Sequence, residues 1–303
     1  FITAMLESTS LIQALSSGGD DFISKPFDVA VLESKLNAHL RIRQLNQELQ
    51  VKNNQLLLVN QQLQLEQKSI MIFFDNALKN NSFNRELIKY HMSPVSLFNG
   101  DLILAEQHEN GCTYILIGDA IGHGLTAAMV TLPVAILFNE LVKKSLSLGE
   151  VASEINSQLT KLIPRGMFLC ASIIMLNGKG DTLSIWSGGL PESYWFGERG
   201  QLKKLIKSEH LPLGILNAEQ FDDSVQIINV EHGDKLYFYS DGLIEAEIDN
   251  NEMFGSERFS DCLLKYDENR FDQVLAELRL HTTGKKQNDD ITLLELTCCP
   301  SLH

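Results

Sequence analysis

Four short stretches of this chain place aspartate beside glycine or beside a second acid. They are residues 99–101, 118–124, 240–242 and 289–292. Apolar runs lead into two of these aspartates: Ile-Leu-Ile comes shortly before Asp119, and Leu-Tyr-Phe-Tyr before Asp241. A buried strand that ends in an acid is costly unless something neutralises the charge. If these strand ends converge, their carboxylates form an all-oxygen site for a hard divalent cation such as Mg²⁺ or Mn²⁺.

The order of the motifs is more specific than the acids alone. Gly-Asp-x-x-Gly-His-Gly is followed by a helical pattern, then by Tyr-Ser-Asp-Gly, and finally by Asp-Asp-Ile-Thr. In this order the motifs resemble the metal-dependent (PPM, type 2C) serine/threonine phosphatases, above all the bacterial branch that regulates sigma-factor partner switching. The resemblance covers about residues 94–296, and residues 211–215 and 253–255 carry smaller marks of the same branch.

The resemblance implies an α+β fold, in which an antiparallel β-sandwich is flanked by helices and holds metal ions at one end. It also implies two Mn²⁺ or Mg²⁺ ions with a bridging water, which attacks the phosphorus in line and expels the serine or threonine oxygen. No covalent phosphoenzyme is then required, in agreement with the absence of a Cys-x₅-Arg sequence.

The same resemblance assigns roles by motif position. Asp119 is expected to bridge both metals, with the backbone carbonyl of Ala120 as a ligand of one. Asp101 is expected to complete the shell of that metal, directly or through water, while Asp241 and Asp289 hold the other. Asp290 and Gly242 are expected next to these ligands, outside the coordination shell. The expected catalytic residues are Asp119, Asp241 and His123.

Three positions need separate treatment. His123 is either a general acid for the leaving oxygen or a structural residue near the metals, and the sequence leaves both readings open. Many relatives carry a second acid where this chain has Leu104, and a Gly-His in the middle of the domain is replaced here by Gly188-Gly189. Neither departure removes an acid that is assigned to the metals.

The residue pattern from position 81 to 303 predicts short strands with helices among them, as in an α+β sandwich. Helices are expected over residues 124–144, 147–162, 256–264 and 271–281. Strands are expected over residues 169–176, 182–187, 193–196, 224–230, 235–240 and 291–296.

Residues 1–41 resemble the C-terminal part of an α/β two-component receiver domain. The marks are an early Thr-Ala, Gly-Gly-Asp-Asp and Lys-Pro-Phe. In that family the Thr3 position binds the acceptor phosphate, Phe22 moves on activation, and Lys25 pairs with the phosphate beside a Lys-Pro bond that is usually cis. The phosphoacceptor aspartate lies upstream, so we expect a truncated receiver whose full-length form meets a histidine kinase. The alternative is an ordinary turn at Lys25.

The segment 42–80 differs in composition, because it is rich in Gln, Asn and Leu. A heptad register fits it, and eight of the ten a and d residues are apolar, which predicts a coiled-coil linker and a parallel homodimer. The alternative is one amphipathic helix packed on its own chain. The a positions are Ile42, Leu49, Leu56, Leu63 and Ile70, and the d positions are Leu45, Lys52, Val59, Glu66 and Phe73.

The net charge, the cysteine spacing and the apolar stretches of the chain argue against several classes of function. The net charge of −14 argues against nonspecific binding of nucleic acid or of anionic membranes, since both need basic patches. The five cysteines show no CxxC spacing, as is typical of reduced core residues. Neither an apolar stretch of about 18 residues nor a signal peptide is recognised, so we expect a cytoplasmic protein.

The expected function is that of a response regulator whose output domain hydrolyses phosphoserine or phosphothreonine, with an anti-sigma-factor antagonist as the substrate implied by the resemblance. One alternative is a catalytically silent phosphatase fold that acts as an adaptor for a sigma factor or its regulator. Retention of all four acids favours the enzyme. A second alternative, a metal-dependent nuclease, is disfavoured by the negative charge.

Overall fold

The computed structural model describes most of the chain, with gaps mainly at the two ends. Of residues 2–3, 24 and 73–78 only the backbone is described. The chain separates into two compact units, Phe1–Lys68 and Ser69–His303. The described residues are 2–3, 18, 21, 23–26, 28–78, 87–96, 98–122, 124–247, 252–265, 269–284 and 287–298.

The first unit contains two short parallel strands and the start of a long helix. Strand β1 (Ile2–Thr3) pairs in parallel with β2 (Ile23–Ser24). The Lys25-Pro26 peptide is cis, as predicted. The Asp28 carboxylate accepts a hydrogen bond from the Ala30 amide at 2.8 Å and so caps the helix. Phe22 lies outside the described residues.

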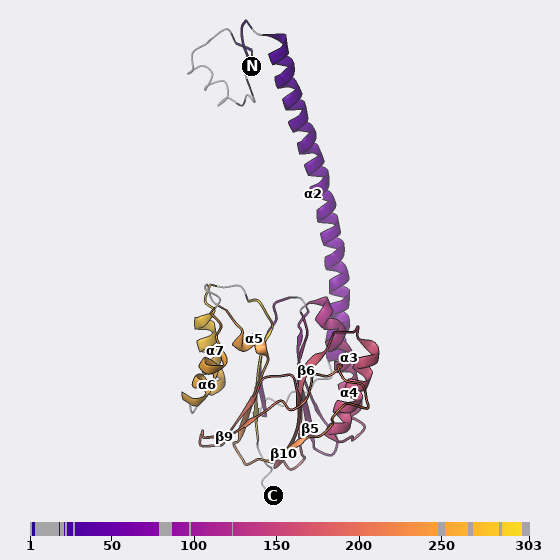
Figure 1. Cartoon of the computed structure of the whole chain (residues 1–303), viewed down its shortest axis with the longest axis vertical. Coiled ribbons are helices and arrows are strands. Elements are labelled where there is room, and N and C mark those ends of the chain that lie inside the picture. Colours follow the sequence, from indigo (N-terminus) through magenta and orange to yellow (C-terminus); the bar gives the residue numbers. More distant parts are fainter. Residues whose placement is uncertain are drawn as a thin grey trace. The chain divides into compact units, whose positions relative to one another are not determined.

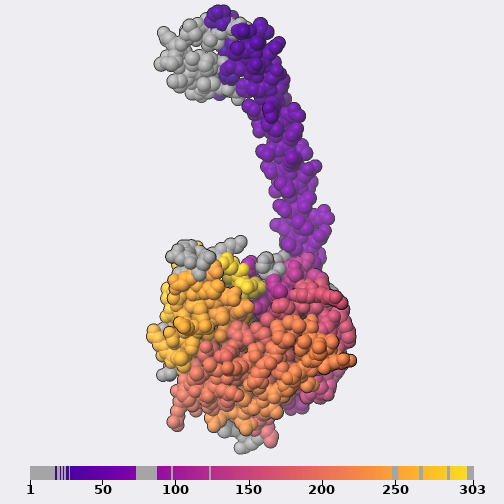
Figure 2. Space-filling model, in the orientation of Figure 1, coloured from indigo at the N-terminus to yellow at the C-terminus, as the bar shows by residue number. Residues whose placement is uncertain are grey.

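Helix α2 (Val29–Leu78) runs without interruption from the receiver-like segment through the heptad segment. The a and d residues between Ile42 and Leu63 that are apolar keep at least half of their side-chain surface exposed. Figure 2 shows this helix in space-filling form, in the indigo to violet part of the colour scale. These residues therefore present an exposed apolar seam along the helix.

The second unit is built on two five-stranded antiparallel sheets (Figure 1). The first has the order β10-β7-β6-β5-β4 and the second the order β3-β12-β11-β8-β9. The first sheet consists of β4 (Asp101–Gln107), β5 (Thr113–Ala120), β6 (Leu169–Leu176), β7 (Thr182–Gly188) and β10 (Gln226–Asn229). The second consists of β3 (Ile88–Ser93), β8 (Ser193–Phe196), β9 (Leu202–Ile206), β11 (Lys235–Tyr239) and β12 (Ile291–Thr297).

Four layers bury both faces of each sheet, which explains why β5 and β12 are apolar at successive positions rather than at alternate ones. Between the sheets, Ile103, Ile117 and Ile185 pack with Phe238 and Leu294. Helices α3 (Leu125–Val142) and α4 (Leu148–Leu162) cover the outer face of the first sheet (Figure 1). Helices α6 (Ser256–Lys265) and α7 (Arg270–His281) cover the outer face of the second.

These layers confirm the predicted α+β fold with two packed antiparallel sheets and flanking helices. The predicted helices and strands agree with the observed ones to within about two residues, and Ser147 and Glu150 form a capping box at the start of α4. Strands β3, β4 and β9 and the single-turn helix α5 (Asp241–Ile244) were not predicted. Strand β9 and helix α5 have at most five residues, too few to give a periodic signal.

Helix α3 corrects one expectation. It is 18 residues long with a mean hydropathy of 1.8, so by length and composition alone it could cross a membrane, although no such stretch was expected. Its apolar character has another cause in this fold. Ala127, Val130, Val134 and Phe138 pack into the core over the first sheet, and 56% of the helix is buried.

Candidate metal-binding site

The four predicted acids lie at the ends of four adjacent segments of the sandwich. Asp101 opens β4 and is paired in register with Asp119 near the end of β5. Asp241 opens α5 directly after β11, and Asp289 lies just before β12, the neighbour of β11. Asp119 interacts electrostatically with the other three acids. The tertiary structure therefore brings together two acids from each sheet.

Asp101 is the most deeply buried of the four, with 3% of its surface exposed. Its Oδ2 atom accepts a hydrogen bond of 2.9 Å from the Ser240 hydroxyl, which belongs to the other sheet. Its Oδ1 atom is buried and has no hydrogen-bond partner among the described residues. Burial is the largest influence on Asp101 and raises the pKa of its carboxyl to about 7, while the Thr292 and then the Ser240 side chain oppose the rise.

Asp119 lies where the negative charges concentrate. Burial raises the pKa of its carboxyl to about 9, and the neighbouring charges of Asp101, Asp241 and Asp289 act in the same direction. A carboxyl group in such surroundings holds its proton near neutral pH unless a cation compensates the charge.

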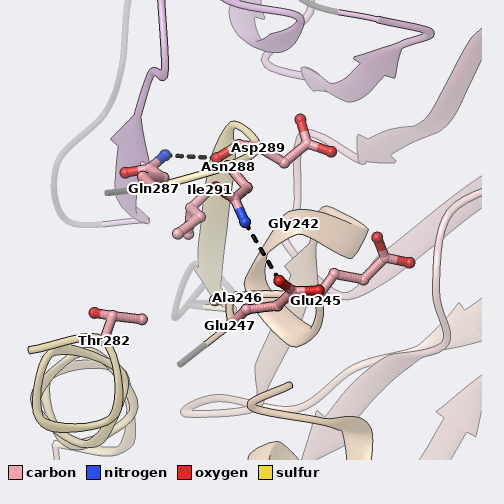
Figure 3. A pocket seen from close by; sticks show the side chains of 9 residues that line it. All are labelled: Gly242, Glu245, Ala246, Glu247, Thr282, Gln287, Asn288, Asp289 and Ile291. Atoms are coloured by element: carbon pink, nitrogen blue, oxygen red, sulfur yellow. Dashed lines mark hydrogen bonds between the residues drawn. The ribbon is translucent and has the colours of Figure 1, made fainter. Parts of the chain in front are cut away.

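The cluster opens toward solvent at Asp289, which is exposed. Asp289 and Gly242 also line a pocket of about 120 Å³ that continues to Glu245, Glu247 and the end of α7 (Figure 3). In this pocket Asn288 donates a hydrogen bond of 3.4 Å to Glu247, and the Gln287 side chain donates one of 2.7 Å to the carbonyl of Asp289. The open end of the cluster is thus acidic and accessible from outside.

The carboxylate of Asp290 makes different contacts from that of Asp289. Its Oδ1 atom accepts a hydrogen bond from the Val95 amide and its Oδ2 atom one from the Gly100 amide, both at 2.6 Å, and the residue is buried. Asp290 therefore fastens the loop that leads into Asp101, and both of its oxygens are already engaged by the protein.

Replacing Asp290 with alanine should lower the stability of the domain. The change would leave two backbone N–H groups without their acceptors, which costs about 3 kcal/mol in total and lowers Tm by about 9 °C for a domain of this size. Differential scanning calorimetry measures the shift, with Asp261→Ala on the exposed face of α6 as the control. A Tm equal to that of the wild type would contradict a fastening role for Asp290.

Two glycines allow the segments to approach one another closely. An ideal Cβ atom at Gly242 would stand 2.0 Å from the carbonyl oxygen of Asp290. At Gly100 it would stand 2.9 Å from the Gly122 oxygen and 3.2 Å from the Ala120 oxygen. Since real side chains do not fit at such distances, glycine is required at both positions. The Ala120 carbonyl, a predicted ligand, thus lies against the Gly100 backbone, and the Ala120 amide donates to the Gly100 carbonyl at 3.0 Å.

A comparison with protein families matches residues 109–298 to the model for Stage II sporulation protein E (SpoIIE). The match covers more than half of the chain. This chain belongs to the SpoIIE family. The matched range contains Asp119, Asp241 and Asp289 but begins after Asp101, so the case for Asp101 rests on its strand pairing with Asp119.

Two curated proteins of Bacillus subtilis resemble parts of the chain. Phosphoserine phosphatase RsbP is 24% identical over 178 residues, which are 55% of this chain and 43% of RsbP. Transcriptional regulatory protein SpaR is 49% identical over 41 residues, which are 14% of this chain and 19% of SpaR. The chain thus spans less than half the length of each of these relatives.

Solved structures share the fold of this SpoIIE-family chain. The SiaA-PP2C domain of Pseudomonas aeruginosa superposes with a TM-score of 0.60 at 18% identity, over 77% of this chain and 93% of that one. The phosphatase domain of Bacillus subtilis SpoIIE, with a fragment of its regulatory domain, superposes with a TM-score of 0.59 at 17% identity, over 72% and 63%. At these identities the likeness concerns the PP2C fold alone.

The two departures from the phosphatase motifs have a structural cause in this member of the SpoIIE family. Leu104 is fully buried in the core beneath α3 and α4, where a charged acid would be costly. Gly189 has a φ of 82°, and a Cβ atom there would stand 2.6 Å from Pro212 and 2.8 Å from the Cys170 thiol. A histidine does not fit at this position, because the loop 211–215 already fills the space.

The predicted site residues outside the acid cluster have mixed outcomes. His123 and Phe22 lie outside the described residues. Thr3 pairs with Ser24, so the strand pairing places it next to the segment that carries Lys25, whose side chain is exposed. Cys170 borders the cluster, but burial first, and the Asp119 and Asp241 charges second, raise the pKa of its thiol to about 12. The thiol is therefore protonated at neutral pH and is a poor nucleophile.

The donor set fits a hard cation. Within the part of the chain that the structure describes, no three His, Cys, Asp or Glu side chains close into a ready set of metal ligands. Neighbouring acids nevertheless add to the effect of burial in raising the pKa of the Asp101 and Asp119 carboxyls, and Asp101 Oδ1 is buried without a partner among the described residues. Both features describe a site that lacks positive charge, and all its donors are oxygens, the atoms that Mg²⁺ and Mn²⁺ prefer.

Sequence reasoning missed one residue of the site. The Tyr-Ser-Asp-Gly motif contains Ser240 but does not indicate a role for it, and the structure shows its hydroxyl donating a hydrogen bond to Asp101. A hydroxyl residue directly before an acid at the end of a buried strand was the available signal. Its partner could not be inferred, since Asp101 is 139 positions away in the sequence.

Proposed function

We propose that this chain is the output region of a two-component response regulator and a metal-dependent protein serine/threonine phosphatase. The observation that carries the proposal is the meeting of Asp101, Asp119, Asp241 and Asp289 at one end of a PP2C-type sandwich, with one buried carboxylate oxygen left unpartnered. Membership of the SpoIIE family supports the same reaction class.

Two Mn²⁺ or Mg²⁺ ions would be held by these residues. Asp119 would be shared between them, Asp101 and the Ala120 carbonyl would belong to one, and Asp241 and Asp289 to the other. When bound, the ions would supply Lewis acidity toward a phosphate ester and a nucleophilic water near neutral pH. The chain itself contributes orientation: the Ser240 hydroxyl holds Asp101, and Asp290 holds the loop before it. His123 is retained as a candidate general acid for the leaving oxygen.

The proposed substrate is a phosphorylated anti-sigma-factor antagonist or a similar small phosphoprotein. The acid cluster opens at an exposed residue, Asp289, so a phosphorylated side chain on a folded partner can reach it. The net charge of −14 disfavours nucleic acid as the phosphate source. The similarity to RsbP, whose name describes a phosphoserine phosphatase, supports phosphoserine as the group that is hydrolysed, with the serine oxygen as the leaving group.

The N-terminal part would carry the control signal in the cytoplasm. Strands β1 and β2, the cis Lys25-Pro26 bond and the 41-residue similarity to SpaR support a truncated receiver domain, which a histidine kinase would phosphorylate in the full-length protein. The continuous helix α2, with its exposed heptad seam, would form a parallel coiled-coil homodimer that joins the receiver to the phosphatase.

Phosphate release from a phosphorylated antagonist protein tests the enzyme directly. The wild-type chain should release phosphate with Mn²⁺ and stop when EDTA removes the metal. Asp241→Ala should reduce the rate by about a hundredfold or more, because metal ions provide several kcal/mol of transition-state stabilisation. Asp261→Ala, an exposed acid on α6, should leave the rate unchanged.

Two results would contradict the proposal. Tight binding of the phosphoprotein without any hydrolysis, at saturating Mn²⁺, would favour the silent adaptor. Cleavage of DNA or RNA by the same preparation, with no turnover of phosphoserine, would instead favour the nuclease.

A further inference from the structure

The two sheets are joined at the acid cluster by a buried hydrogen bond through Ser240. This residue follows β11 in the second sheet, whereas its acceptor, Asp101, opens β4 in the first. Both residues are almost fully buried, with 1% and 3% of their surfaces exposed. A hydrogen bond to a charged group that is shielded from water contributes more than one on the surface, so this link can set the position of the carboxylate.

The orientation of the Ser240 hydroxyl is fixed by β12. The Thr292 amide donates to Ser240 Oγ at 3.0 Å, and the Ser240 amide donates to the Thr292 carbonyl at 3.1 Å. The Thr292 N–H can only donate, so Ser240 Oγ is the acceptor there and keeps its own hydrogen for Asp101. The serine is thus held by backbone groups of Thr292, whose positions are fixed by the strand and do not change with a side-chain rotamer.

The consequence appears when two buried acids are compared. Both oxygens of Asp290 accept hydrogen bonds from backbone amides, so this carboxylate stabilises the loop and has no oxygen without a partner. In Asp101 the Ser240 hydroxyl engages Oδ2 alone and leaves Oδ1 without a partner. Ser240 thereby turns the free oxygen of Asp101 in one direction, as a hydrogen-bonded neighbour does for a metal ligand.

We propose that Ser240 is a positioning residue for cation binding, which orients Asp101 of the first sheet relative to Asp241, its own neighbour in the second. The inference rests on the proposed metal-dependent function. In this proposal Ser240 does not contact the cation. Its hydrogen bond holds Asp101 of the first sheet in the orientation needed to bind the same cation site as the acids of the second sheet. Its loss should therefore weaken metal affinity more than it slows the metal-loaded enzyme.

Mn²⁺ binding to the whole chain tests the role without reference to activity. Isothermal titration calorimetry on Ser240→Ala should give a Kd for Mn²⁺ that is about 10- to 100-fold weaker than that of the wild type. The rate at saturating Mn²⁺ should change by only a few fold, while the Mn²⁺ concentration for half-activation rises in parallel with Kd. If Ser240→Ala does not fold, Ser240→Cys keeps nearly the same volume with a much weaker donor and permits the same comparison.

Tyr114→Phe is the matched control. It removes a hydroxyl that donates to the Leu146 carbonyl at 3.0 Å, at the opposite end of β5 from Asp119, and should lower stability without changing Kd for Mn²⁺. Equal Kd values for the wild type and the Ser240 variant would overturn the positioning role while leaving the phosphatase proposal intact. Absence of Mn²⁺ binding in the wild type would overturn the metal-dependent function itself, and this inference with it.

Discussion

Asp119→Asn should abolish Mn²⁺-dependent phosphate release and, at the same time, make the metal-free protein more stable. The activity should fall about a thousandfold or more, because the proposed bridging ligand serves both ions and metal ions contribute several kcal/mol to such reactions. Asparagine has nearly the same shape as aspartate, so the fold should survive the change.

The gain in stability follows from the raised pKa of Asp119. Its carboxyl has a pKa of about 9 in the folded protein, mainly because of burial, against about 3.9 in an unfolded chain. Between these values the unfolded chain releases the proton and the folded one retains it, so stability declines as pH rises from about 4 to 9. Asparagine does not titrate and escapes this decline. At pH 8 the metal-free variant should melt roughly 5 °C higher, corresponding to about 2 kcal/mol.

Scanning calorimetry at pH 5 and pH 8, with and without Mn²⁺, separates the two effects. The Tm advantage of the variant should grow with pH in EDTA and disappear when Mn²⁺ stabilises the wild type. Asp261→Asn, at an exposed position of α6, should show neither effect. A variant that keeps its activity, or that loses stability at pH 8, would exclude Asp119 from the centre of the site.

Introducing Leu56→Asp together with Leu63→Asp should convert a dimer of this chain into monomers. Both are a-position residues of α2 with half or more of their side-chain surface exposed in the single chain. Burying each leucine contributes about 2 kcal/mol, whereas burying an unpaired carboxylate in the seam is strongly unfavourable. Multi-angle light scattering at micromolar concentration measures the change. In the full-length protein the same variant should lose control of phosphatase activity by receiver phosphorylation.

The helix offers a closely matched control. Leu58 and Leu65 are also seven residues apart and are somewhat more exposed than Leu56 and Leu63, but they occupy c positions, in a second line of apolar side chains with Val51 and Ile72. Leu58→Asp with Leu65→Asp should leave the dimer intact if a and d form the seam. Dissociation by the c-position pair alone would shift the seam to that second line, and a monomeric wild type would remove the coiled coil altogether.

The elements of the fold were largely predictable because their signals are local. The apolar spacing from Leu125 to Leu141 predicts a helix, and Ser147 with Glu150 supplies a capping box. The continuous apolar runs before Asp119 and Asp241 identify strands covered on both faces. Strands β3, β4 and β9 and helix α5 were missed. Strand β9 and helix α5 have at most five residues, and β9 is stabilised by its pairing with β8 rather than identified by its own periodicity.

By itself, the sequence determined the identity and order of the acids, because each stands in a short motif whose glycines and neighbours can be read within a few positions. Only the tertiary structure decided what these acids do to one another. The pairing of Asp101 with Asp119, the Ser240 bond from the other sheet and the engagement of both Asp290 oxygens join residues far apart in the chain. Such contacts depend on how two sheets pack, and the burial that raises the pKa of Asp119 exists only after they have done so.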